Sequence, residues 1–417
     1  MSKITQVKAR QILDSRGNPT LEVEVSTEKT HSIASVPSGA STGLNEMLEL
    51  RDGGKSFHGK GVSAAIKNVS KISSKLKGMS VLNQEKIDNI MIKLDNTSNK
   101  SRLGANSMLG ISLAVCRAAS WEQKQVLYNH IANLFDTKKV CLPVPMFNII
   151  NGGQHASNNL EIQEYMLVPH KAKSFSEALQ IGSEVYHELK KLLIERFGKC
   201  EVNVGDEGGF APRLNCVEEP FDFILEAVNN LGYSKKVGLA LDCAASNFYR
   251  KGKYYLEGQE HTSSELIDYY VDLTKNYPLI SIEDPFFEED FDSFASLNKK
   301  IGKKVMVVGD DLTVSNPKRI QKAIVNDSCN CLLLKPNQIG TLTETFESAR
   351  LAMHNKWNVI VSHRSGETND NFIADLSVGL GCGWIKAGAP CRGERLAKYN
   401  QLLRIEHNMG KKAKFSK

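Results

Sequence analysis

Four short apolar runs in the second half of the chain each give way to an ionisable side chain. Short Val/Ile/Leu runs bounded by glycine, proline or charge are typical of parallel strands buried on both faces. Each gap between the runs has room for a helix, so we expect successive βα units whose carboxyl ends share one face. The runs cover residues 237–241, 279–282, 305–308 and 332–334, and they end at Asp242, Glu283, Asp310 and Lys335.

The first third of the chain has a different pattern. Residues 20–26 alternate apolar and acidic side chains, which predicts a strand with one face in water, and residues 31–36 are expected to pair back against it. Helical patterns follow over residues 62–77, 83–94 and 104–123. We therefore predict an N-terminal α+β domain with an antiparallel sheet over residues 1–137.

Residues 138–417 are predicted to form a βα barrel. The strand-like segments 144–150 and 164–168 are joined by a stretch too short and too polar for a crossover helix, so they should be antiparallel neighbours. Helical patterns at 176–196 and 218–231 precede six alternating strands and helices. The predicted order is ββαα(βα)6, an α/β fold with an N-terminal capping domain. The six strands end near Asp242, Glu283, Asp310, Lys335, Ser362 and Lys386.

The composition argues against a nucleic-acid-binding, secreted or membrane protein but does not indicate a reaction. The chain has 417 residues, more than one typical core needs, with 41% hydrophobic and 24% charged residues. The net charge of +6 is modest and the basic run at 411–414 is short, which favours a solvated tail over a nucleic-acid contact. Nine cysteines without a C-x-x-C pair indicate reduced thiols, and neither a signal peptide nor a membrane span is evident. We expect a cytoplasmic enzyme.

The strand-end carboxylates predict a metal site. Asp242, Glu283 and Asp310 would repel one another without a cation, and Mg²⁺ is the hard divalent ion that fits oxygen ligands best. Lys335 and Lys386 occupy equivalent positions, and a nearby metal should lower their pKa toward that of a base. Salt bridges between these lysines and the same carboxylates are an equally good interpretation.

Other polar residues lie outside these strands. Asp206 and Glu207 sit between glycines, and a carboxyl group held away from the metal should stay protonated and act as a general acid. Arg364 and Ser365 are candidates for holding an anion, with His363 and His155 beside them.

Two glycine-rich motifs are misleading. Residues 39–43 satisfy the G-x-S-x-G pattern of a serine hydrolase, but the segment that follows is too short and broken for the required helix. Residues 54–60 resemble a phosphate-binding loop, but Gly61 stands where a serine or threonine is needed.

Taken together, seven stretches resemble the enolase family over essentially the whole chain. No single stretch decides this, but all seven occur in the family's order, and that family's barrel also has the ββαα(βα)6 order. The stretches are 14–20, 38–43, 205–212, 281–285, 334–341, 361–368 and 398–405.

The resemblance implies reversible dehydration of 2-phosphoglycerate to phosphoenolpyruvate with two Mg²⁺ ions per site. It implies Lys335 as the base, Glu207 as the acid with Glu164 beside it, and Lys386 as a cation that stabilises the enolate. Family members form dimers or octamers. The matching metal ligands are Asp242, Glu283, Asp310 and, for the second ion, Ser41 in a mobile lid; the matching substrate contacts are His155, Glu164, His363, Arg364, Ser365, Lys386 and Ser41.

Four positions depart from the family's usual residues, and two other functions stay open. We expect these departures to affect rate or stability but not the reaction. The alternatives are another enolase-superfamily enzyme and an inactive scaffold or surface-binding protein with the same fold. The departures are Trp384, Ala387, Gly393 and Asn369.

Overall fold

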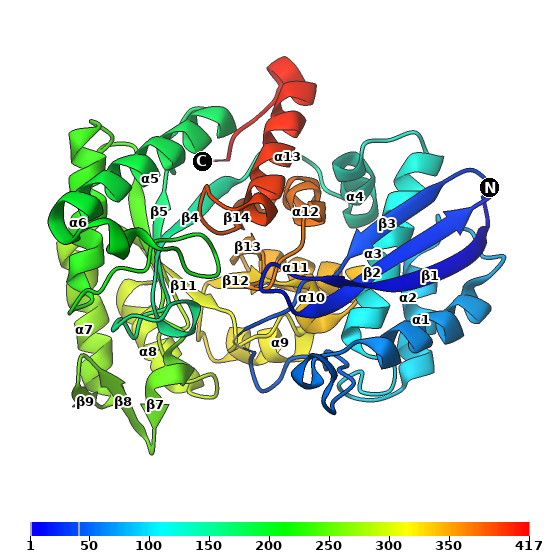
Figure 1. Ribbon diagram of the computed structural model, residues 1–417, viewed down its shortest axis with the longest axis horizontal. Helices are drawn as coiled ribbons and strands as arrows, with labels where there is room; N and C mark the ends of the chain where they lie inside the picture. Colours follow the sequence, from blue (N-terminus) through cyan, green and yellow to red (C-terminus); the bar gives the residue numbers. More distant parts are fainter. Residues whose placement is uncertain (1, 41, 417) are drawn as a thin grey trace.

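The computed structural model describes residues 2–40 and 42–416. Figure 1 shows two parts side by side: a small antiparallel sheet backed by helices, and a barrel surrounded by helices. No helix in the described residues is both long enough and apolar enough to cross a membrane.

The N-terminal part is a three-stranded antiparallel sheet in the order β1-β2-β3, covered by helices. The predicted pairing of residues 20–26 with 31–36 is confirmed, but β1 was not predicted, because most of its side chains are polar and exposed. The elements are β1 (Ile4–Leu13), β2 (Pro19–Thr27), β3 (His31–Ser35), α1 (Ser63–Leu76), α2 (Gln84–Asp95), α3 (Ala105–Glu122) and α4 (Leu127–Phe135).

The barrel closes in the order β10-β11-β12-β13-β14-β4-β5-β6. β5 runs antiparallel to both of its neighbours and the remaining barrel pairs are parallel, which confirms the ββαα(βα)6 order. The antiparallel pair exists because residues 152–163 are too few for a crossover. The strands are β4 (Val144–Asn151), β5 (Glu164–Val168), β6 (Gly238–Asp242), β10 (Leu279–Glu283), β11 (Met306–Gly309), β12 (Cys331–Leu334), β13 (Asn358–Ser362) and β14 (Gly383–Lys386).

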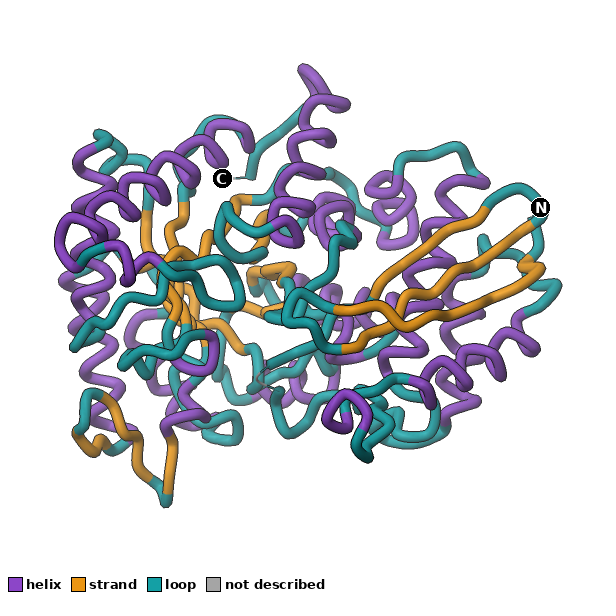
Figure 2. The backbone as a smooth tube through the Cα atoms, viewed as in Figure 1, coloured by secondary structure: helices purple, strands orange, loops and turns teal. Residues whose placement is uncertain are grey.

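A ring of helices surrounds the barrel, and Figure 2 shows it outside the strands. A small sheet projects from this ring and was not predicted; it consists of β7 (Tyr249–Arg250), β8 (Lys253–Leu256) and β9 (Gln259–His261). The helices are α5 (Phe175–Phe197), α6 (Glu218–Asn230), α7 (Ser263–Asn276), α8 (Phe291–Ile301), α9 (Pro317–Val325), α10 (Pro336–Ile339), α11 (Leu342–His354), α12 (Phe372–Leu380) and α13 (Gly393–Met409).

Buried apolar side chains join the two parts. One hydrophobic cluster combines side chains of β2 and α3, such as Val23 and Ile111, with Leu342, Phe346 and Leu376 of the barrel helices. Because this core crosses between the two parts, the N-terminal part is held firmly against the barrel. The N-terminal part therefore has a fixed position relative to the carboxyl ends of the barrel strands.

Candidate active site

The ends of three barrel strands meet at one lysine. Lys386 Nζ lies 3.0 Å from Asp242 Oδ2, 3.0 Å from Glu283 Oε1 and 3.0 Å from Glu164 Oε2. All four side chains are at most 6% exposed. The predicted convergence of Asp242 and Glu283 is thus present, and an ammonium group holds the two carboxylates together.

The third predicted carboxylate is paired with the second lysine. Lys335 Nζ lies 2.5 Å from Asp310 Oδ2, and Gln338 donates a hydrogen bond of 2.8 Å to Asp310 Oδ1. Asp284, which follows β10, accepts backbone N–H groups from both Asp310 and Asp311 and so fixes the end of β11. We call Lys335, Lys386, Asp242, Glu283 and Asp310 the lysine cluster.

Without a metal, the pKa of both lysines is raised, so the expectation of a pKa lowered by a nearby metal stays a prediction. Burial lowers the pKa of Lys335, but the Asp310 carboxylate outweighs burial and the pKa is raised. The pKa of Lys386 is raised well above its ordinary value, because Asp242, Glu164 and Glu283 outweigh burial. The salt-bridge interpretation of these lysines is the one that the structure shows.

The donor set at the strand ends fits a divalent cation. Four buried carboxylates, Glu164, Asp242, Glu283 and Asp310, face only two ammonium groups within this cluster. An excess of oxygen ligands of this kind favours a hard cation such as Mg²⁺. Asp310 also belongs to a second group of carboxylates with Asp284 and Asp311, whose oxygens lie within 4.8 Å of one another.

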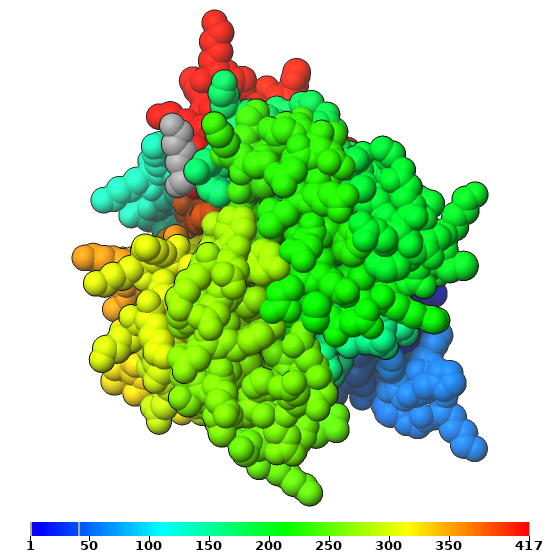
Figure 3. Space-filling model, turned by 90° about the vertical axis from the view of Figure 1, so that its left-hand side faces the viewer, coloured from blue at the N-terminus to red at the C-terminus, as the bar shows by residue number. Residues whose placement is uncertain are grey.

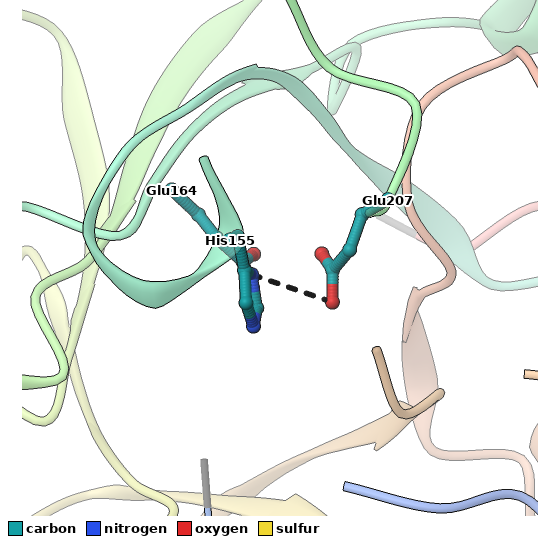
Figure 4. Close-up of side chains that lie close together, drawn as sticks. All are labelled: His155, Glu164 and Glu207. Carbon is teal, nitrogen blue, oxygen red and sulfur yellow. Dashed lines mark ion pairs between the residues drawn. The ribbon is translucent and has the colours of Figure 1, made fainter. Parts of the chain in front are cut away.

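A second set of side chains surrounds Glu207, in the loop after α5. Asn148 donates a hydrogen bond of 2.8 Å to Glu207 Oε2, and His363 Nε2 lies 3.4 Å from the same oxygen. His155 Nδ1 lies 3.6 Å from Glu207 Oε1 and 3.5 Å from Glu164 Oε1, so that Glu164 and Glu207 approach the same imidazole (Figure 4). We call Glu164, Glu207, His155, His363 and Asn148 the glutamate cluster.

The two glutamates of this cluster have pKa shifts in opposite directions. Burial raises the pKa of Glu164, and the negative charge of Glu207 raises it further, while Lys386 opposes the shift. Burial acts in the same direction on Glu207, but His363, His155 and the nearby arginine Arg395 outweigh it and hold its pKa well below the ordinary range. These directions favour protonation of Glu164 over Glu207, and the acid role of Glu207 stays a prediction.

One residue that the sequence analysis missed organises this cluster. Arg395 of α13 is fully buried, and its guanidinium donates to His363 Nδ1 and to the Arg364 carbonyl, both at 2.7 Å. It also donates to the carbonyls of Asp206 and Ser365. Since Nδ1 accepts this hydrogen bond, the ring proton of a neutral His363 lies on Nε2 and faces Glu207. Burial lowers the pKa of His363 to about 4, so the ring is neutral at pH 7.

The anion-binding candidates lie under the loop of residues 37–50. Arg364 donates to both oxygens of Glu46, at 2.9 and 3.0 Å, and to Asn337 at 3.1 Å. Ser365 Oγ accepts a hydrogen bond of 2.8 Å from the backbone of Ala40. Glu46 was not predicted, and a lone glutamate in a loop gave no signal for it.

The structure after this loop's G-x-S-x-G pattern also argues against a serine hydrolase. Ser38 exchanges two backbone hydrogen bonds with Gly366, and Leu44 N donates to Glu288, so further contacts attach the loop to the barrel. No helix is present in the described residues 42–55. Ser41 itself lies outside the described residues, and its predicted role stays a prediction.

One small cavity of about 20 Å³ lies between the two clusters. A volume of this size holds about one water molecule. Three cations that line it, Lys335, Lys386 and Arg364, are each engaged in an ion pair. A larger ligand needs these side chains to move apart. The cluster residues that line the cavity are Lys335, Lys386, Asp242, Glu164, Glu207, His155 and His363.

Comparison with family models identifies the relatives of this architecture. A model described as "Enolase, N-terminal domain" matches residues 4–131, and one described as "Enolase, C-terminal TIM barrel domain" matches residues 139–417. The second match alone covers more than half of the chain. The chain belongs to the enolase family. Enolase-family membership supports a lyase-type enzyme that uses a divalent metal.

Two of the positions at which this enolase-family chain departs from the usual residues are neighbours. A Cβ atom on Gly393 would lie 3.9 Å from Asn369 Oδ1. The serine and the acid that are more usual there would be close enough to interact, and both are replaced together. Ala387 is fully buried and Trp384 packs partly against the barrel interior.

Proposed function

We propose that this protein is an enolase that reversibly dehydrates 2-phosphoglycerate to phosphoenolpyruvate. The observation that carries the proposal is that two lysines, two glutamates with opposite pKa shifts, and Arg364 with Ser365 line one buried cavity. Removal of a proton next to a carboxylate needs a base, loss of a hydroxyl group needs an acid, and a phosphate needs a bidentate donor. The cavity contains one group for each requirement.

Substrate binding uses the residues beneath the loop of residues 37–50. The phosphate replaces Glu46 at the guanidinium of Arg364 and accepts a hydrogen bond from Ser365. His155 and His363 line the remainder of the cavity. This exchange of a carboxylate for a phosphate opens the space that the protein alone lacks.

The reaction then needs one proton to leave C2 and one to reach the departing oxygen. Lys335 Nζ, once released from Asp310, takes the C2 proton, and Lys386 faces the negative charge that develops on the substrate carboxylate. Glu207, with the proton that the pair shares with Glu164, protonates the C3 hydroxyl group. The hydroxyl leaves as water and a C2–C3 double bond forms.

Two Mg²⁺ ions are proposed for each site. Asp242, Glu283 and Asp310 would hold the first, and Ser41 would help to hold the second together with the substrate. When bound, these ions supply positive charge next to the substrate carboxylate and so lower the energy of the enolate. Entry of the first ion would also release the lysines from their carboxylates.

The proposal includes the protein's setting. We expect a homodimer or an octamer, a cytoplasmic location and no nucleic-acid partner.

One assay tests the function. Adding 2-phosphoglycerate with Mg²⁺ should produce the ultraviolet absorbance of phosphoenolpyruvate, and a chelator should abolish it. An inactive scaffold gives no signal, and a different superfamily enzyme acts only on another carboxylate. A signal indifferent to the chelator would contradict the proposed role of the metal.

A further inference from the structure

A second group of potential metal ligands lies away from the active-site cavity, where the segment before α6 meets the small β7–β9 sheet. Ligand atoms of Cys216, Glu218 and Glu257 all lie within 4.8 Å of one another. Cys216 lies just before α6, Glu218 is the first residue of that helix, and Glu257 lies in the turn between β8 and β9. Figure 3 shows the face of the molecule on which residues of this part of the chain gather.

Backbone hydrogen bonds hold two of these side chains in position. Glu257 Oε1 accepts the N–H of Val217 at 2.6 Å, which ties the β8–β9 turn to the start of α6. Glu218 Oε1 accepts a hydrogen bond of 3.2 Å from the hydroxyl of Tyr269. Each carboxylate therefore keeps its second oxygen for a further ligand.

The charges around this group favour a cation. Burial raises the pKa of Glu257, and the neighbouring Glu218 and Glu161 raise it further, with His261 acting in the opposite direction. Burial also raises the pKa of Cys216; the adjacent carboxylates add to this, while backbone N–H groups of Glu218 and Glu219 oppose it. A bound cation would relieve the repulsion and convert the thiol to thiolate.

An independent observation comes from the interior side of the group. Tyr165 of β5 is fully buried, and its hydroxyl has no hydrogen-bond partner among the described residues. Its ring packs edge-on against Phe221 in the first turn of α6. Burial raises the pKa of Tyr165, and Tyr269, Cys243, Glu257 and Glu161 raise it further, so one of the three ligand candidates acts on this hydroxyl. A buried donor without a partner indicates a missing polar neighbour, such as a metal-bound water.

We propose that Cys216, Glu218 and Glu257 bind a zinc ion, with water as the fourth ligand. A thiolate with two carboxylates suits the borderline-soft Zn²⁺, whereas Mg²⁺ avoids sulfur ligands. The ion would join α6 to the β7–β9 sheet, with the Tyr165 hydroxyl in contact with its water. This site is separate from the strand-end carboxylates, since none of its residues lines the active-site cavity.

Cobalt titration tests the site, because Co²⁺ replaces Zn²⁺ and a thiolate ligand gives a near-ultraviolet charge-transfer band. The full-length protein is titrated with Co²⁺ in excess Mg²⁺, which occupies the active-site carboxylates. We expect one band that Zn²⁺ abolishes. Cys216→Ser should remove the band, whereas Cys200→Ser, at another free and exposed cysteine, should leave it unchanged.

Two glutamate variants, one at a proposed ligand and one as a control, provide a second measurement if the cysteine variant folds poorly. Glu257→Gln should weaken Co²⁺ binding by about tenfold or more. Glu260→Gln, at an exposed residue of the same small sheet, should not. The proposal is overturned if the wild-type protein shows no band, if the band survives Cys216→Ser, or if Glu260→Gln weakens binding as much as Glu257→Gln.

Discussion

The lysine cluster and the glutamate cluster are buried to a similar degree but balance their charges differently. In the first, ammonium groups touch carboxylates directly, as Lys386 does with Asp242 and Glu283. In the second, Glu207 faces His363 and His155, whose pKa values burial lowers, and its nearest arginine lies behind a histidine. Carboxylates in the first cluster are neutralised by lysine, whereas in the second the pKa of Glu164 is raised and that of Glu207 is lowered.

This difference divides the chemistry between the clusters. In the proposed function, a cation that pairs with Asp310 would free Lys335 to act as a base. Burial and a like charge raise the pKa of a carboxyl group and make it a better proton store, as Glu207 does for Glu164; in the proposed reaction Glu207 passes this proton on. Glu164 touches both clusters, because it also contacts Lys386.

The largest expected effect comes from removing the base. Lys335→Ala should lower kcat by about a thousandfold or more, since general bases contribute about 10² to 10⁴ and this one also pairs with Asp310. Steady-state assay of phosphoenolpyruvate formation measures the loss. Lys318→Ala, at an α9 residue outside the cavity, is the control and should keep normal activity.

Variants of Glu207 and Glu164 should impair a different step of the reaction from Lys335→Ala. Glu207→Gln should lower kcat by about 10²- to 10³-fold, because proton delivery fails while the C2 proton is still removed. Glu164→Gln should also lower kcat, since the proton of the pair is lost. Equal activity of wild type and Glu164→Gln would show that the two glutamates do not share a proton.

Variants of Arg395 test whether the glutamate cluster depends on the hydrogen bond from Arg395 to His363. Arg395→Gln should reduce kcat by about ten- to a hundredfold with a smaller change in KM, because His363 loses the donor that fixes its ring. Arg395→Lys should recover part of that loss. The control is Arg404→Gln, an exposed position on the same helix; a purely structural role would leave kcat unchanged in the folded fraction of both Arg395 variants.

His130 of α4 shows what burial does without a carboxylate nearby. Burial lowers the pKa of His130 from 6.5 to about 4, and its Nδ1 pairs with Gln123. The unfolded chain binds a proton below pH 6.5 and the folded chain does not, so stability falls as the pH drops from 6.5 toward 4. His130→Asn should remove about 2–3 kcal/mol of that loss at pH 4, measured by denaturant unfolding at several pH values. An unchanged pH dependence would contradict it.

Much of the fold could be predicted from apolar periodicity. The strands ending at Asp242, Glu283, Ser362 and Lys386 end where predicted, because buried parallel strands are continuous apolar runs. β1 and the β7–β9 sheet escaped prediction, since polar side chains dominate both. The domain boundary at 137 stays a prediction.

The sequence could bring candidate site residues together, but it could not show their ion pairs, and their roles stay predictions. The predicted strand ends and the family resemblance identified the catalytic candidates. Both signals depend only on positions along the chain. Which carboxylate meets which cation depends on contacts between distant segments, such as Lys335 with Asp310 and Arg364 with Glu46. Arg395 gave no signal, since an arginine in a helical pattern is usually exposed.

Exchange of the substrate's C2 proton with deuterated solvent tests the division of labour most directly. Nuclear magnetic resonance of 2-phosphoglycerate, with enzyme and Mg²⁺, reports this exchange independently of dehydration. Exchange should continue in Glu207→Gln and stop in Lys335→Ala. Exchange that persists in the lysine variant, or stops in the glutamate variant, would contradict the assignment of base and acid to the two clusters.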